Sequence, residues 1–133
     1  MDKKWKVIYY EDINDYSEIF DFIENQKENN QIKILNWLNK LEELGPNLPR
    51  PYADYLDDGI YELRIKLSGN QIRILYFFCY KEFIILSNQF RKNTGKVPKN
   101  EIQKSKNIRD DFLKRFDEIL MRRLYDEDIK KTN

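Results

Sequence analysis

The sequence predicts an α+β fold in the order β-α-α-β-β-β-α, with a small, twisted and mostly antiparallel sheet. Hydrophobic residues recur at helical spacing between residues 14 and 44 and at strand spacing between residues 60 and 90. The length of 133 residues and the 41% hydrophobic content support one core, and the 35% charged content provides its exterior. We therefore expect a single domain over residues 1–125 and a polar, frayed tail over residues 126–133.

The N-terminal half predicts one strand followed by two antiparallel helices. Residues 5–10 are aromatic and β-branched, which is typical of a strand. A capping box that begins at Asp15 predicts a first helix over residues 14–27. A second helix is expected over residues 30–44, because Gly45 and the proline after it end a helix. This helix pair is expected to cover one face of the sheet.

The middle of the chain predicts a loop and then a meander of three strands. Residues 46–58 contain three prolines and are expected to form the loop. Strand alternation over residues 60–67 and 72–78 predicts a hairpin with its two-residue turn at 69–70. Residues 83–90 then form the third strand of the meander.

A long C-terminal helix is expected to begin near Pro98, at an edge of the sheet or on the face opposite the helix pair. Its predicted buried side consists of Ser105, Ile108, Phe112, Phe116, Ile119 and Leu120.

Composition excludes several classes of protein. The absence of histidine excludes Ser-His-Asp triads and histidine-based metal sites. The single cysteine, Cys79, cannot form an internal disulfide and suits a reducing cytoplasm. No apolar run approaches the ~18 residues of a membrane span, and patterned sequence starts directly after the N-terminus, so neither a membrane helix nor a signal peptide is expected.

Charge is distributed unevenly along the chain. Residues 1–58 hold 7 Lys/Arg and 13 Asp/Glu, whereas residues 59–99 hold 8 Lys/Arg and 2 Asp/Glu. The local balances are therefore −6 and +6, although the whole chain carries only +1. This segregation indicates a basic patch suited to phosphates or acidic partners, unless the acidic half folds beside the basic half and neutralises it.

The hairpin is expected to carry the centre of that basic patch. Alternation places Arg64, Lys66 and Arg73 on one exposed face, with Lys66 directly opposite Arg73 and with Glu62 as the carboxylate of that face. Like charges that face each other across a sheet are destabilising, and a bound nucleic-acid phosphate would relieve the repulsion. The alternative is that carboxylates from the preceding loop fold over this face, the candidates being Asp54, Asp57 and Asp58.

The end of the third strand adds further cations. Arg91, Lys92 and Lys96 follow Phe90, whose ring offers a stacking surface for an RNA base. The alternative interpretation of this segment is a solvated basic loop.

Four segments carry a resemblance to the RelE/ParE superfamily of bacterial toxins, and within it to the phage-derived HigB-type toxins. They are Asp58-Gly59-Ile60-Tyr61-Glu62-Leu63-Arg64, Arg73-Ile74-Leu75-Tyr76-Phe77-Phe78, Phe90-Arg91-Lys92-Asn93-Thr94, and Lys96-Val97-Pro98 with Glu101. The resemblance covers about residues 4–110 and implies a RelE-like domain with this order of elements.

The resemblance implies a type II toxin that cuts mRNA in the ribosomal A site without a metal or cofactor and inhibits translation and growth. The RNA 2′-hydroxyl would attack the adjacent phosphate. The positions that match the family's catalytic residues are Arg64, Arg73, Arg91 and Lys92, and the implied RNA-binding residues are Lys66, Phe90 and Lys96. Since the chain has no histidine, Lys92 or Lys66 is the candidate general base.

The resemblance also implies a partner, a HigA-like helix-turn-helix antitoxin in a toxin–antitoxin hetero-oligomer. Either the acidic helix pair or the long C-terminal helix could seat it. Two other functions stay open: a ParE-like gyrase inhibitor without nuclease activity, and a non-enzymatic basic RNA-binding module.

Overall fold

Five strands form one mixed sheet with helices on both faces. The computed structural model describes residues 3–93 and 95–125. The elements are β1 (Lys6–Tyr9), α1 (Glu18–Glu24), α2 (Glu28–Leu44), the 3₁₀ turn η1 (Gly45–Asn47), β2 (Ala53–Asp57), β3 (Ile60–Leu67), β4 (Asn70–Cys79), β5 (Phe83–Lys92), α3 (Lys99–Arg115) and α4 (Glu118–Tyr125). The strand order is β1-β5-β4-β3-β2, with β1 parallel to β5 and the other neighbours antiparallel. The predicted α+β class is confirmed, and the expected tail over 126–133 lies outside the described residues.

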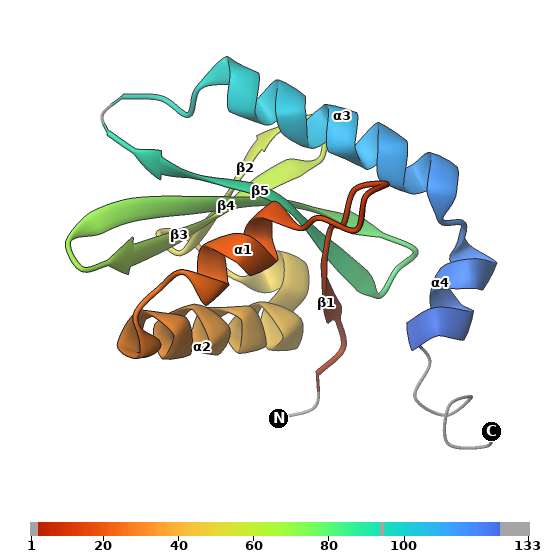
Figure 1. Cartoon of the computed structure of the whole chain (residues 1–133), viewed down its shortest axis with the longest axis horizontal. Coiled ribbons are helices and arrows are strands. Elements are labelled where there is room, and N and C mark those ends of the chain that lie inside the picture. The colour runs from red at the N-terminus through yellow and green to blue at the C-terminus, as the bar shows by residue number, and fades with distance from the viewer. Residues whose placement is uncertain (1–2, 94, 126–133) are drawn as a thin grey trace.

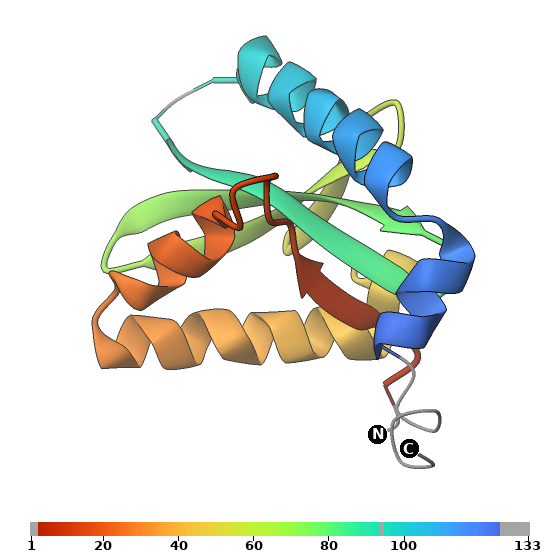
Figure 2. The same ribbon diagram turned by 45° about the vertical axis from the view of Figure 1, so that its right-hand side comes forward.

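Helices cover both faces of the sheet (Figure 1), and a hydrophobic layer lies between the sheet and the helices on each face. The α1–α2 pair covers one face, where Ile34 and Leu41 pack against Leu63 and other apolar residues of β3, β4 and β5. On the other face, Phe112 of α3 and residues of α4 pack against Phe77 and its neighbours. Figure 2 shows α3 on the side of the sheet opposite α2. The C-terminal helical segment therefore lies on the face opposite the helix pair, which was one of its two expected positions.

The first helix begins later than predicted. Ser17, not Asp15, is its N-cap, and the Ser17 hydroxyl accepts a hydrogen bond of 3.1 Å from the backbone N–H of Phe20. Asp15 lies in the preceding turn with a positive φ of 62°. Because α1 starts at Glu18 and ends at Glu24, it is half the expected length.

The segment predicted as a loop contains a strand, so that prediction is wrong. β2 pairs antiparallel with β3, with Ala53 opposite Leu63 and Asp54 opposite Glu62. Two prolines, Pro49 and Pro51, precede it at positions where they remove no hydrogen bond from the β2–β3 ladder. Its stability comes from pairing with β3, a partner that local sequence patterns do not reveal.

The long C-terminal helix is broken in two. Phe116 adopts an extended conformation and ends α3, and the Asp117 carboxylate accepts a hydrogen bond from the N–H of Leu120 at the start of α4. The break rotates the apolar side of the following turn. Met121 is consequently buried and Ile119 is exposed, so the prediction that Ile119 lies on the buried side of the C-terminal helix is wrong.

Candidate functional site

The two central arginines of the hairpin lie directly opposite each other. Arg64 on β3 pairs with Arg73 on β4, and Lys66 pairs with Gln71. The expected pairing of Lys66 with Arg73 is therefore wrong. The turn is Ser68-Gly69, whose φ values of 50° and 86° are both positive, as a type I′ turn requires. Moving the turn by one residue shifts each cross-strand partner by two and leaves the faces unchanged.

The predicted division of the hairpin into two faces is confirmed. Leu63, Ile65 and Ile74 belong to the core beneath α1 and α2. The opposite face, toward α3, carries Glu62 and Arg73, which form an ion pair across the sheet. Strand alternation places Arg64 and Lys66 on this same face.

The arginines are compensated by carboxylates, contrary to the expectation of an uncompensated patch. Arg73 Nε lies 2.7 Å from Glu62 Oε1, and only 8% and 2% of the two side chains are exposed. An Arg64 NH2 atom lies 3.2 Å from Asp54 Oδ2 and 3.5 Å from Glu62 Oε2. The alternative that a carboxylate folds over this face is therefore correct for Asp54, which β2 brings beside Glu62.

Asp57 and Asp58 are bound elsewhere. The Asp57 carboxylate lies 2.7 Å from Lys106 Nζ, and the Asp58 carboxylate lies 2.9 Å from an Arg109 NH2 atom. Both partners are on α3, so these two aspartates tie the β2–β3 corner to that helix.

Burial also affects the chemistry of Arg73. Desolvation lowers the pKa of its guanidinium, the nearby Glu62 charge raises it, and the Arg64 charge lowers it again. Its NH1 group donates to Gln71 Oε1 at 3.4 Å and to the carbonyl oxygen of Ile72 at 3.3 Å. Arg73 is nearly buried and its charge faces Glu62. It is therefore suited to fixing the Glu62 carboxylate, which in turn lies 3.5 Å from Arg64.

The cations at the end of β5 do not all lie together. Phe90 is opposite Arg73 and Lys92 is opposite Gln71, so both share the face of the arginine pair. Arg91 is opposite Ile72 and therefore points toward the α1–α2 side. Lys96 is exposed in the loop before α3. The structure thus brings together five of the seven predicted residues, namely Arg64, Lys66, Arg73, Phe90 and Lys92.

Lys66 and Lys92 form no ion pair with any residue in the ranges 3–93 and 95–125. Phe90 packs against the apolar layer under α3, with part of its surface still exposed. Beyond the compensated arginines, this face therefore offers two available ammonium groups and part of an aromatic ring.

The sequence reasoning did not include Arg50 or assign Asp54 a specific partner. Arg50 donates to Asp54 twice, from Nε at 3.0 Å and from NH2 at 2.8 Å. These contacts hold the pKa of the Asp54 carboxyl below its ordinary value. The i,i+4 spacing of Arg50 and Asp54 was visible in the sequence, but its meaning depends on the undetected strand β2.

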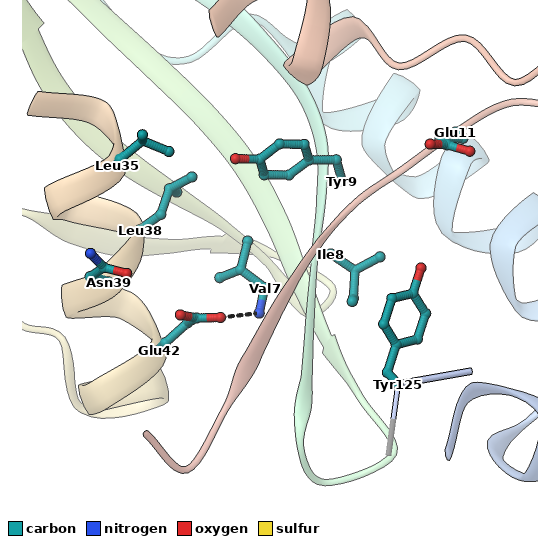
Figure 3. A pocket seen from close by; sticks show the side chains of 9 residues that line it. All are labelled: Val7, Ile8, Tyr9, Glu11, Leu35, Leu38, Asn39, Glu42 and Tyr125. Atoms are coloured by element: carbon teal, nitrogen blue, oxygen red, sulfur yellow. Dashed lines mark hydrogen bonds between the residues drawn. The ribbon is translucent and has the colours of Figure 1, made fainter. Parts of the chain in front are cut away.

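A separate groove of about 340 Å³ runs along β1, between α2 and α4 (Figure 3). Val7, Tyr9 and Tyr125 contribute to its lining, together with Leu35 and Glu42. Glu42 Oε2 accepts a hydrogen bond of 2.9 Å from the backbone N–H of Val7, which satisfies one donor on the outer edge of β1. None of the predicted site residues lines this groove.

The described residues contain neither a metal-binding cluster nor a membrane-spanning helix. In residues 3–93 and 95–125, no three Asp, Glu or Cys side chains gather in a way that would hold a metal ion. None of the helices in that part of the chain is both long and apolar enough to cross a membrane.

Residues 21–110 match the family described as phage-derived protein Gp49-like (DUF891). The match runs from within α1 to the middle of α3 and includes Arg50, Arg64 and Arg73 with their carboxylate partners Asp54 and Glu62. The chain belongs to this family. The Gp49-like family is a RelE/HigB-like toxin family of phage origin. A comparison with curated proteins finds none that matches the Gp49-like chain.

Proposed function

We propose that this Gp49-like chain is the toxin of a type II toxin–antitoxin module and acts as an endoribonuclease on mRNA at the ribosome. Membership of a RelE/HigB-like toxin family carries the proposal. The sheet face with Lys66, Lys92 and the partly exposed Arg64 supports it, because clustered cations beside an aromatic ring suit single-stranded RNA.

In the proposed reaction, the RNA 2′ oxygen attacks the adjacent phosphorus and the bond from phosphorus to the 5′ oxygen breaks. The products are a 2′,3′-cyclic phosphate and a free 5′-hydroxyl. Lys92 or Lys66, in its neutral form, accepts the proton of the 2′-hydroxyl, and the leaving 5′ oxygen takes a proton from solvent water. Arg64 stabilises the charge that develops on the phosphate.

The structure changes the roles proposed for the other two arginines. Since Arg73 is buried against Glu62, we assign it the positioning of Glu62 and Arg64 rather than contact with RNA. Since Arg91 points toward the opposite face, we assign it to RNA or ribosome contact outside the reacting centre.

Mapping of mRNA 5′ ends after induction tests the nuclease proposal. The wild-type chain is expected to create new 5′-hydroxyl ends, and replacement of the general base, by Lys92→Ala or by Lys66→Ala, is expected to abolish them while the protein still folds. Lys114→Ala, which removes an exposed lysine of α3, is the matched control and should cut like the wild type. Normal cutting by both Lys92→Ala and Lys66→Ala would refute the proposed site.

The pairing of Arg64 and Arg73 with carboxylates favours a second candidate, a ParE-like toxin that inhibits gyrase by binding alone. Such a toxin would leave mRNA intact and change plasmid supercoiling after induction. Measuring both mRNA 5′ ends and plasmid supercoiling in the same induced cultures therefore distinguishes the two functions.

We also propose a HigA-like helix-turn-helix antitoxin as the partner. Co-expression of a small helix-turn-helix protein encoded beside this gene should restore growth and copurify with the chain. Growth arrest that persists despite equal expression of both proteins would contradict this assignment.

A further inference from the structure

Two arginines from different elements converge on the carboxylate of Asp54. Arg50, from the loop before β2, contacts both of its oxygens, and Arg64 of β3 reaches Oδ2 at 3.2 Å. The exposed fractions of the side chains are 76% for Arg50, 30% for Arg64 and 18% for Asp54. Both guanidiniums are therefore accessible from solvent.

The charges of this cluster do not balance. Glu62 is held by the buried Arg73 at 2.7 Å and is more distant from Arg64, at 3.5 Å. Asp54 is therefore the main carboxylate that compensates the two accessible cations, Arg50 and Arg64. The buried Arg64 Nε has no hydrogen-bond partner within the described part of the chain. A phosphate offers more acceptor oxygens than a carboxylate, and guanidinium groups bind it in the same bidentate manner.

An aromatic hollow of about 240 Å³ adjoins the cluster. Arg50 and Asp54 form part of its wall, and Tyr55, Tyr61 and Tyr76, which lie on the α1–α2 face of the sheet, form another part. Of these three rings only that of Tyr55 is exposed, 5.2 Å from the Tyr61 ring in an edge-on arrangement. The Tyr55 ring, in the same hollow as Arg50 at the β2 edge, is suited to stacking with a nucleotide base next to a phosphate bound by Arg50, whereas free phosphate cannot stack.

We propose that Arg50 and Arg64 form a phosphate subsite for single-stranded RNA, in which the Asp54 carboxylate occupies the position of the phosphate until RNA displaces it. The ion pair of Asp54 with Arg50 is exposed on its Arg50 side, and such pairs contribute little to stability, so loss of this contact should lower the stability of the fold only slightly. The subsite extends the proposed RNA-binding face across β3 to the β2 edge, and it rests on the proposed function for the identity of the ligand.

Binding of a ten-nucleotide single-stranded RNA to the purified full chain tests the subsite. Asp54→Asn keeps the side-chain volume and removes the competing charge. We expect it to bind the RNA about two- to fivefold more tightly, the range an exposed ion pair is worth. The affinity should also fall more steeply with salt, by about 0.7 in the log–log slope for one added phosphate contact.

Glu118→Gln is the matched control. It removes a carboxylate from another exposed i,i+4 pair, that of Glu118 with Arg122, and changes the net charge by the same amount. An equal gain in affinity for both variants would overturn the proposal, because it would reflect net charge alone. An unchanged or weaker affinity of Asp54→Asn would also overturn it.

Arg50→Ala provides a test in which folding is not at risk, since Arg50 is the most exposed member of the cluster. It should weaken RNA binding more than Arg123→Ala, which removes an exposed arginine of α4. It should also abolish the gain from Asp54→Asn in the double variant. Equal effects of Arg50→Ala and Arg123→Ala would refute the subsite.

Two further measurements separate the possible ligands and the two proposals. Inorganic phosphate that displaces the RNA from Asp54→Asn at equal concentration would show a free-anion site and overturn the RNA assignment. Failure of the nuclease proposal appears as intact mRNA after induction, whereas failure of the subsite appears as unchanged RNA affinity in these variants. Each result can occur without the other.

Discussion

Glu62 and Arg73 form a buried ion pair, and loss of either partner is expected to destabilise the fold strongly. Their charged atoms are 2.7 Å apart, and 2% and 8% of the side chains are exposed. Removing one partner from a buried pair leaves an uncompensated charge in a poorly hydrated site, which typically costs about 3–5 kcal/mol. The two single variants should fall at different ends of this range.

Arg73→Ala is expected at the lower end, about 3 kcal/mol, because Arg64 remains 3.5 Å from Glu62 and partly compensates it. Glu62→Ala is expected at the upper end, about 5 kcal/mol, because it leaves Arg73 buried beside the like charge of Arg64. The entropy of unfolding is about 2.1 cal/mol/K per residue, or roughly 0.28 kcal/mol/K for this length, so the melting temperature should fall by about 11 °C and 18 °C respectively.

Thermal unfolding followed by circular dichroism measures both shifts. Arg50→Ala is the control, because it breaks an exposed ion pair and should shift the free energy of unfolding by less than about 1 kcal/mol. The double variant Glu62→Leu/Arg73→Met removes both charges and should be more stable than Glu62→Ala. Two results would refute this account of the pair. One is a melting temperature of the single variants equal to that of Arg50→Ala, and the other is a loss of stability in the double variant equal to the sum of the losses in the two single variants.

This prediction affects how toxicity assays are interpreted. Arg73→Ala is expected to relieve growth arrest, but through lost stability as much as through lost chemistry. Lys92→Ala is therefore the more informative variant for the nuclease proposal.

Three other predictions concern the core and the titrating groups. Desolvation of the half-buried Cys79 thiol raises its pKa to about 12, so iodoacetamide at pH 8 should alkylate it more slowly in the native chain than after unfolding, and equal labelling rates in both states would contradict this. Met121→Ala should lower the free energy of unfolding by about 2–5 kcal/mol and Ile119→Ala by less than about 0.5, as measured by urea unfolding. The reverse order would favour a single unbroken C-terminal helix. Because Arg50 holds the pKa of Asp54 below its ordinary value, this carboxylate stabilises the fold above about pH 4 and loses that contribution as the pH falls through its folded pKa. With no histidine in the chain, the free energy of unfolding should be flat between about pH 6 and 8, and a step within that range would refute this.

Local patterns were sufficient to predict the face of each side chain in the hairpin. Alternation separated Leu63 and Ile74 from Glu62 and Arg73, and it did so although the predicted turn was displaced by one residue. A cross-strand shift by two residues preserves the faces, so this prediction was insensitive to the error. The helix pair was also recognisable, because apolar spacing and the stop at Gly45 are local signals.

The partners of the charged residues depended on the tertiary structure. β2 has no strong pattern of its own, and it becomes a strand because β3 supplies its hydrogen-bond partners. Only that pairing brings Asp54 beside Glu62 and between Arg50 and Arg64. Periodicity reports which way a side chain points relative to its own backbone, whereas charge compensation depends on what a distant segment places opposite it. The sequence by itself therefore determined that cations gather on one face, and the tertiary structure decided which of them remain available.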